Sequence, residues 1–164
     1  MKRVTDICRR DSVFGGTIVD TVTLDFDNRR RRRIRLTADG GTEFLLDLPE
    51  LQTLRDGDIL LLQEGGGIKV RARDEPVVDI TCKDQAHLVR IAWHLGNRHL
   101  PTELMGGRLR IRQDHVIEEM VTRLGATTSR LNAPFNPEGG AYGHGETQGH
   151  DHHDHSHGHH HNHG

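Results

Sequence analysis

Histidine is concentrated near the end of the chain, where it alternates with small and polar residues. Ten of the 14 histidines lie between residues 144 and 164, separated by glycine, aspartate, serine and asparagine. At neutral pH most imidazole rings are uncharged and present a nitrogen lone pair that suits divalent zinc, nickel and copper ions. Glycine and serine between the rings let such a stretch wrap around an ion. We therefore predict a metal-binding tail whose ligands are His144, His150, His152, His153, His155, His157, His159, His160, His161 and His163.

Two other interpretations of the tail concern its composition. A purification tag is usually an unbroken histidine run behind a short linker, whereas Ser156, Gly158 and Asn162 interrupt this one and glycine already recurs from Gly139. A disordered solubility tail would have this polarity, but it would not require histidine. We interpret residues 139–164 as a disordered, metal-binding tail that adds nothing to a core.

Two further histidines, His87 and His94, lie seven residues apart in a helical pattern. A rise of about 1.5 Å per residue separates them by roughly 10 Å, too far for two ligands of one ion. The usual helical metal motif, H-E-x-x-H with histidines four residues apart, is absent. Both are interpreted as ordinary surface or interface histidines.

His99 differs because it lies in a loop, in the sequence GNRHLP directly after the predicted helix. Pro101 restricts the backbone beyond it, so the ring could serve as a fixed anchor ligand. One imidazole does not hold a divalent ion, and its partners would have to come from the tail or from another subunit. A two-fold dimer would supply a second His99. The alternative is a loop histidine that caps the helix carbonyls.

The first 74 residues have the pattern of short β-strands. Phe44, Leu46 and Leu48 share one face, across from Ile34 and Leu36, and Pro49 is expected to end that strand. Glycine-rich turns (ADGG, RDGD, EGGG) separate the segments, which is typical of a small sandwich or open barrel. The predicted strands are Thr21–Phe26, Arg33–Thr37, Thr42–Leu48, Asp58–Leu62 and Ile68–Arg73.

Residues 75–138 follow a different pattern, beyond a polar boundary at Arg71–Pro76. Gly96 is expected to end the first helix, Asp114 to begin the second and Gly125 to end it. The order of elements is βαββαβ, which is typical of a ferredoxin-like fold, so the chain is predicted to be α+β. The expected elements are strand Val77–Cys82, helix Asp84–Leu95, strands Thr102–Met105 and Leu109–Arg112, helix Val116–Leu124 and strand Ala126–Leu131.

An arginine run forms the strongest charge feature outside the tail. It could bind nucleic-acid phosphates, but no aromatic residues interleave with it, acidic residues surround it and the net charge is −2. A strand edge kept from pairing by charge is one alternative. A docking surface for an acidic protein partner is the other, and it would use Arg29, Arg30, Arg31, Arg32 and Arg33.

Catalytic and membrane functions find no support in the sequence. Ser12, Ser129 and Ser156 lack a nucleophile context, and EGGG lacks the Gly-Lys-Ser/Thr ending of a phosphate-binding loop. Two distant cysteines do not form a disulfide framework. The N-terminal residues lack the apolar region of a signal peptide, and no apolar run approaches the roughly 20 residues of a membrane span. We expect a cytoplasmic, non-enzymatic protein that binds neither nucleic acid nor membranes.

Three segments taken together resemble the urease accessory protein UreE family of nickel metallochaperones: the helix with GNRHLP, LRIRQDHVIEEM, and PFNPEGGAYGHG before a histidine-rich end. The resemblance covers both predicted domains and the tail. It implies a cytoplasmic homodimer in which the two His99 side chains bind Ni²⁺ at the dimer interface. Because imidazole also suits other divalent ions, Zn²⁺ or Cu²⁺ would bind in vitro as well. The resemblance also implies delivery of Ni²⁺ to the urease apoprotein complex, through the urease accessory GTPase.

One family feature is incomplete in this chain. Some members carry a second metal-binding pair, His-x-His, before the second helix, and the matching positions here are Gln113 and His115. His115 is therefore expected to be a weak ligand. The family also implies a peptide- or partner-binding role for residues 1–74, which suits the arginine run. The alternative function is a nickel or zinc store without a delivery role.

Overall fold

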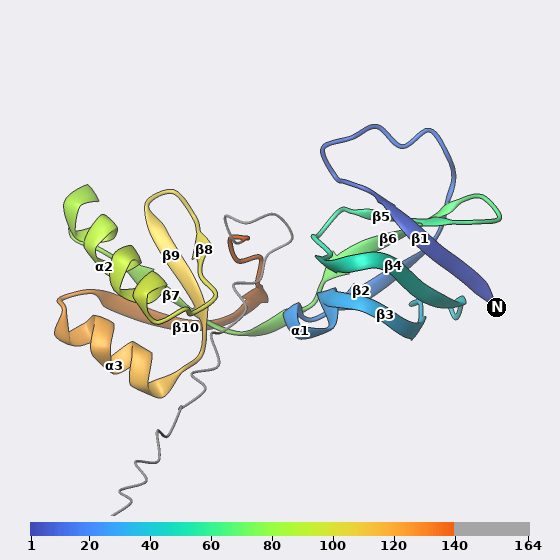
Figure 1. Cartoon of the computed structure of the whole chain (residues 1–164). Coiled ribbons are helices and arrows are strands. Elements are labelled where there is room, and N and C mark those ends of the chain that lie inside the picture. Colours follow the sequence, from blue (N-terminus) through green and yellow to red (C-terminus); the bar gives the residue numbers. More distant parts are fainter. Residues whose placement is uncertain (140–164) are drawn as a thin grey trace, which may run out of the picture.

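The computed structural model describes residues 1–139, which form two β-sheets placed end to end (Figure 1). The N-terminal sheet has six strands and curls upon itself, and the C-terminal sheet has four strands and two helices. The predicted α+β fold is confirmed. The tail histidines and the predicted disorder of residues 140–164 lie outside the described residues.

The N-terminal sheet has the strand order β2-β6-β5-β1-β4-β3. The predicted register is confirmed, because Ile34 lies opposite Leu46 and Leu36 opposite Phe44. The first strand and the short helix α1 had not been identified from the sequence. The elements are β1 (Lys2–Cys8), β2 (Ile18–Leu24), α1 (Phe26–Arg29), β3 (Arg30–Thr37), β4 (Glu43–Thr53), β5 (Ile59–Leu62) and β6 (Gly67–Ala72).

Hydrogen bonds link the two outer strands of this sheet at one end. The backbone N–H of Asp39, just beyond β3, donates to the carbonyl oxygen of Thr21 in β2 at 2.7 Å. The Asp39 carboxylate accepts from the hydroxyls of Thr21 and Thr23, each at 2.8 Å. These bonds satisfy polar groups that an open sheet edge would leave to water or to another chain.

The expectation that Pro49 ends its strand is wrong, since β4 continues to Thr53. The register between β3 and β4 shifts at this point, because Asp47 pairs with Arg33 whereas Gln52 pairs with Arg31. Pro49 therefore lies in a bulge and is not required to donate a ladder hydrogen bond, which proline cannot do.

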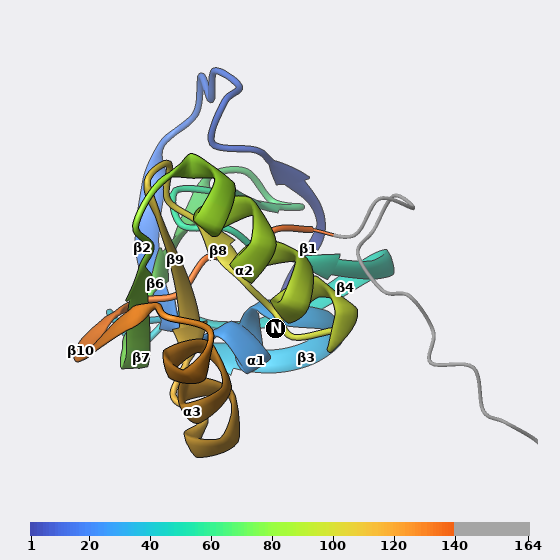
Figure 2. The same ribbon diagram turned by 90° about the vertical axis from the view of Figure 1, so that its left-hand side faces the viewer.

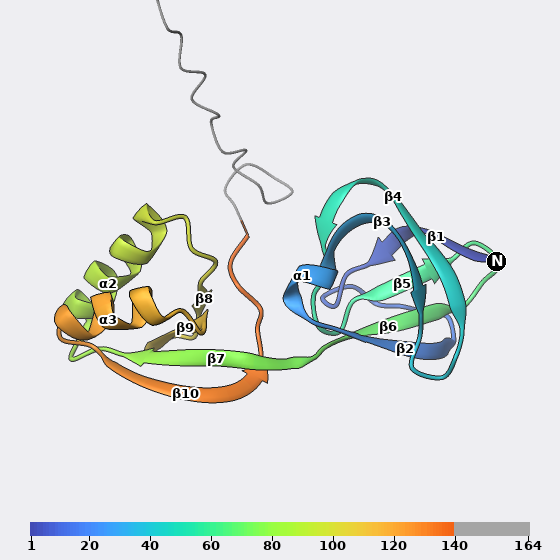
Figure 3. The same ribbon diagram turned by 90° about the horizontal axis from the view of Figure 1, so that it is seen from below.

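The C-terminal sheet has the antiparallel order β10-β7-β9-β8, which confirms the ferredoxin-like arrangement. Arg73 alone separates β6 from β7, so the chain passes directly from one sheet to the other (Figure 3). The elements are β7 (Asp74–Thr81), α2 (Gln85–Asn97), β8 (Glu103–Leu104), β9 (Arg108–Arg112), α3 (His115–Arg123) and β10 (Thr127–Pro134).

Both helices cover the same face of the C-terminal sheet and lie in front of its strands when seen from that end (Figure 2). Leu88, Ile91 and Leu95 of α2 and Ile117 and Val121 of α3 are buried there. Their spacing of three or four residues places them on one side of each helix. They pack against the strand residues Val78, Ile80, Leu109 and Ile111. Within residues 1–139, neither helix is long and apolar enough to span a membrane.

Candidate metal centre at the end of helix α2

Helix α2 ends in a Schellman motif that centres on His99. The backbone N–H of His99 donates to the Gly96 carbonyl at 3.0 Å, and that of Leu100 donates to the Leu95 carbonyl at 3.3 Å. Leu100 also packs against the core that contains Leu95, a contact that often accompanies this motif. The expectation that Gly96 stops the helix is wrong, because Gly96 lies inside it and the turn falls three residues later.

His99 occupies the left-handed backbone region, with φ of 54°, and no other described residue except glycine has a positive φ. Glycine is the usual residue at this position, because a β-carbon costs about 1 kcal/mol there. Residues kept in such a conformation concentrate at functional sites. The exposed side chain of His99 is therefore a candidate functional group.

The ring of His99 does not cap the helix carbonyls, which was the alternative role. Among residues 1–139, no hydrogen bond involves either ring nitrogen of His99, and the capping bonds come from backbone N–H groups. Within the described part of the chain, both nitrogens are thus available to a ligand. An exposed imidazole is a suitable donor for Ni²⁺, but a single donor leaves the coordination shell incomplete.

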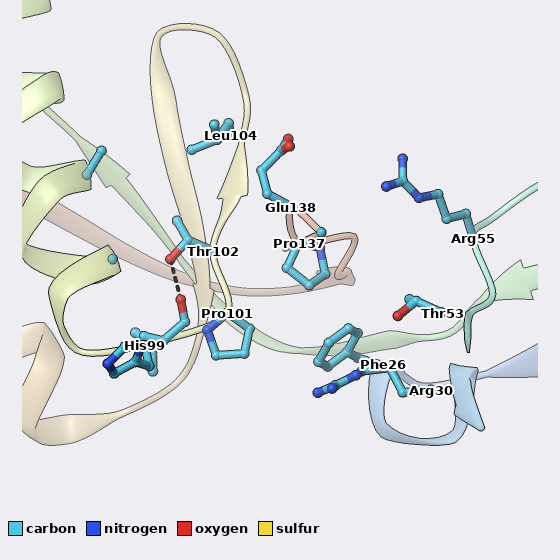
Figure 4. A pocket seen from close by; sticks show the side chains of 14 residues that line it. Phe26, Arg30, Thr53, Arg55, His99, Pro101, Thr102, Leu104, Pro137 and Glu138 are labelled. Atoms are coloured by element: carbon cyan, nitrogen blue, oxygen red, sulfur yellow. Dashed lines mark hydrogen bonds between the residues drawn. The ribbon is translucent and has the colours of Figure 1, made fainter. Parts of the chain in front are cut away.

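His99 also lines a cleft of about 540 Å³ between the two sheets. His99, Pro101 and Thr102 border one side of the cleft, and Phe26 and Arg30 border the other (Figure 4). The third border is residues 137–139, the last described residues of the chain. The cleft therefore brings together parts of the chain that are far apart in sequence, and its lining includes the point where the tail begins.

The segment leading to the tail is fixed on both sides of this cleft. The Arg29 guanidinium donates to the Phe135 carbonyl and, at 3.2 Å, to the side-chain oxygen of Asn136. From the other side, Glu103 accepts from the Asn136 N–H at 2.7 Å. The N–H of Glu138 donates to the Thr102 carbonyl at 2.9 Å, in the same loop as His99.

Arg29 itself has no exposed surface, so it is not available to a partner protein. It also donates to the carbonyls of Leu24 and Leu54 and lies 3.9 Å from the Glu75 carboxylate. Burial lowers the pKa of Arg29, and the Glu75 charge opposes that shift. The predicted docking surface of Arg29 to Arg33 therefore needs a correction, because Arg29 is buried and cannot be part of it.

The other arginines of the run begin the outer strand β3, and Arg31, Arg32 and Arg33 are exposed. Arg31 donates to Asn28 at 3.2 Å, and Arg33 lies 3.9 Å from Asp47. Their position agrees with the alternative of a strand edge kept from pairing by charge.

His87 has a structural role, because both of its ring nitrogens have partners. Its Nδ1 accepts from the Lys83 N–H at 3.0 Å, and its Nε2 lies 2.9 Å from the Leu124 carbonyl at the end of α3. His94 is half-buried and packs edge-on against Trp93, with ring centroids 5.0 Å apart.

His115 is exposed at the first residue of α3, where the side chain of Asp114 caps the helix as predicted. The Gln113 side chain donates to the Val77 carbonyl at 3.4 Å. In residues 1–139, no three His, Cys, Asp or Glu side chains are grouped closely enough to hold an ion. The described part of one chain therefore does not join His99 and His115 into a complete site.

Comparison with known proteins covers nearly the whole chain. A family model described as the N-terminal domain of the UreE urease accessory protein matches residues 11–73, and the model of its C-terminal domain matches residues 75–163. The chain is 50% identical over 137 residues to the urease accessory protein UreE of Chelativorans sp. (strain BNC1), covering 80% of this chain and 87% of that one.

It is also 58% identical over 123 residues to UreE of Bradyrhizobium sp. (strain ORS 278), covering 75% of this chain. The match spans 59% of that relative's length, less than two thirds of it. Both halves of the chain are nevertheless matched by the family models. The chain belongs to the urease accessory protein UreE family.

Proposed function

We propose that this protein binds nickel and delivers it to the urease assembly complex while the urease metal centre matures. The relatives are named urease accessory proteins, which supports a role in urease maturation. The observation that carries the nickel step is His99, an exposed imidazole held in a backbone conformation that favours glycine. Nickel is then the cargo of the protein, and the work is ligand exchange rather than catalysis.

The first missing ligand is the His99 of a second copy, in a two-fold homodimer. Val89 and Trp93, one helical turn apart on α2, are 60% and 63% exposed. A large aromatic residue on an exposed helix face is typical of interface anchors. In a two-fold interface identical residues lie opposite each other, so an interface over the end of α2 pairs the two His99 rings.

Further ligands come from the tail histidines, His144 to His163. A shell completed by the tail can open one ligand at a time, which favours transfer over permanent storage. Because imidazole sites follow the Irving–Williams order, Zn²⁺ and Cu²⁺ also bind in vitro, with Cu²⁺ more tightly than Ni²⁺. His115 adds a weak peripheral ligand.

The recipient is the urease apoprotein complex, reached through the urease accessory GTPase. The exposed part of the arginine run, Arg31 to Arg33, is the docking surface for an acidic segment of such a partner. Opposite charge at a surface of this kind speeds association and selects the partner. Arg30, which is half-buried and already has an interaction partner, borders the cleft instead.

Protons compete with metal for imidazole nitrogens, so nickel affinity should fall below the ordinary histidine pKa of about 6.5. Calorimetric titration at about pH 7.5 and about pH 5.5 measures this directly. Equal affinity at both values would contradict histidine ligation.

The alternative function is storage of nickel or zinc, which the ten tail histidines would support on their own. Complementation of a strain that lacks the gene separates the two functions at limiting nickel. Delivery predicts that the wild-type gene restores urease activity and that His99→Ala does not, with His94→Ala as a control that does. Full activity with His99→Ala would favour storage.

A further inference from the structure

The described chain ends at a fixed point on the wall of the His99 cleft. Phe135 is fully buried, and Arg29, Glu103 and Thr102 hold residues 135–138 by hydrogen bonds from both sheets. Gly139 lines the cleft, and Nη2 of Arg55 lies 3.7 Å from where a β-carbon on Gly139 would be. The next residues of the chain therefore start beside the cleft.

Residues 1–139 leave apolar surface exposed in this cleft. Leu104 lines it with 53% of its surface exposed, next to the half-buried Leu100, Pro101 and Pro137. The side chains of Thr53, Arg55 and Glu138 add polar groups to the same lining (Figure 4). At about 540 Å³, the cleft has the size and the mixed lining of sites that hold compact, partly apolar ligands.

The segment that follows has the composition to fill it. Residues 140–144 read GAYGH, and Tyr142 is the only tyrosine of the chain. Three residues span at most about 10 Å, so Tyr142 stays near the cleft whatever path the chain takes. A tyrosine offers an apolar ring for Pro101, Pro137 and Leu104 and a hydroxyl for the polar lining. Gly140 and Gly143 give this short segment the backbone freedom to turn.

We propose that the cleft is the docking site of this chain's own residues 140–144, with the Tyr142 ring seated between the two sheets. The fixed start at Gly139 favours this occupant over a second copy, because a short tether gives the segment an effective concentration in the millimolar range or above. Docking brings the first tail histidine, His144, to the edge of the cleft that carries His99. That consequence for nickel depends on the proposed function, whereas the docking itself does not.

The single tyrosine makes the docking measurable without metal. In full-length protein labelled with 3-fluorotyrosine, we expect one ¹⁹F resonance, displaced from that of a free GAYGH peptide and independent of protein concentration. Leu104→Ser should return it to the free position, and the matched Leu131→Ser, on β10 and outside the cleft lining, should not. A free position in the wild type overturns the proposal. A displacement that grows with protein concentration also overturns it, since a second copy or another partner then occupies the cleft.

Nickel titration of the same full-length proteins tests the consequence at the metal centre. We expect Leu104→Ser to weaken nickel binding by about tenfold, because the tail loses its local concentration near His99, while Leu131→Ser does not. If the wild-type resonance is displaced but the two variants bind nickel equally well, the docking stands and its proposed effect on nickel binding is overturned. Absence of nickel binding in the wild type would contradict the proposed function, and the resonance would still decide the docking.

Discussion

The two helices of the C-terminal half end in the same hydrogen-bond pattern but with different residues at the critical position. In α3 the N–H groups of Gly125 and Ala126 donate to the carbonyls of Thr122 and Val121, each at 3.0 Å. Gly125 takes the left-handed conformation, with φ of 91°, where His99 at the end of α2 has 54°. The end of α3 has the residue that folding alone prefers. At the end of α2, a histidine takes this conformation instead, which lowers stability locally but places an exposed imidazole there.

The histidines near the two ends have opposite roles. His87 belongs to the first turn of α2, but its ring contacts the end of α3, and its ring nitrogens are occupied by the Leu124 carbonyl and the Lys83 N–H. A metal could bind it only by breaking these bonds. His99 has no partner on either ring nitrogen among residues 1–139, and its backbone N–H completes the hydrogen bonds at the end of the helix. Histidine content therefore does not distinguish these two residues, whereas the hydrogen-bond partners of each ring nitrogen do.

Near the end of α2, the buried Arg29 holds residues 135 and 136 by hydrogen bonds, and removing its side chain should have the largest effect on stability. Arg29→Ala leaves the Glu75 charge and four hydrogen-bond acceptors without their buried donor, which should cost about 3 to 5 kcal/mol. Arg32→Ala, in the same run but exposed, should stay within about 0.5 kcal/mol. Urea unfolding of both variants measures the difference. If Arg29→Ala lost as little stability as Arg32→Ala, Arg29 would not have this structural role.

The end of α3 should show the cost of a β-carbon directly. Gly125→Ala forces a side chain into the left-handed region, and we expect a loss of about 1 to 2 kcal/mol in the free energy of unfolding. The nearest atom to the new carbon would be Nζ of Lys83 at 3.3 Å, a flexible group that can move aside. Gly107→Ala is the control, because nothing lies within 4 Å of a β-carbon there and its φ is not positive. Equal losses in the two variants would remove the conformational explanation.

The smallest effect on stability should have the opposite sign. His99→Gly relieves the left-handed conformation, so we expect the free energy of unfolding to rise by about 1 kcal/mol in metal-free protein. The same substitution inside the helix, His94→Gly, should destabilise the protein because glycine is a poor helix former. Thermal unfolding without metal tests both, and a destabilised His99→Gly variant would show that the ring itself supports the fold.

Much of the fold could be predicted from the sequence because it depends on local patterns. Alternation in β4, helical spacing in α2 and the cap at Asp114 each follow from a few neighbouring residues. The long-range features could not be predicted in this way. The five arginines look alike in sequence, and only the packing of α1 buries Arg29. The cleft joins residues 26–55, 92–104 and 137–139, and no local pattern relates these segments.

His99 could be predicted from the sequence only in part. The loop sequence and the family resemblance identified it as the anchor candidate, but Gly96 suggested that the helix ended three residues too early. The left-handed conformation therefore could not be assigned to His99 until the backbone was known. Composition alone pointed to the tail, which lies outside the described residues.

The most direct test of the central claim, that His99 anchors the nickel site, is a calorimetric nickel titration in which light scattering follows the oligomeric state. It compares the full-length protein, a truncation after Tyr142, and that truncation with His99→Ala. We expect the truncation to lower the number of bound ions but to keep about one per dimer, and His99→Ala to remove that ion while the dimer remains. Loss of all nickel binding on truncation alone, or an unchanged site in His99→Ala, would contradict the account.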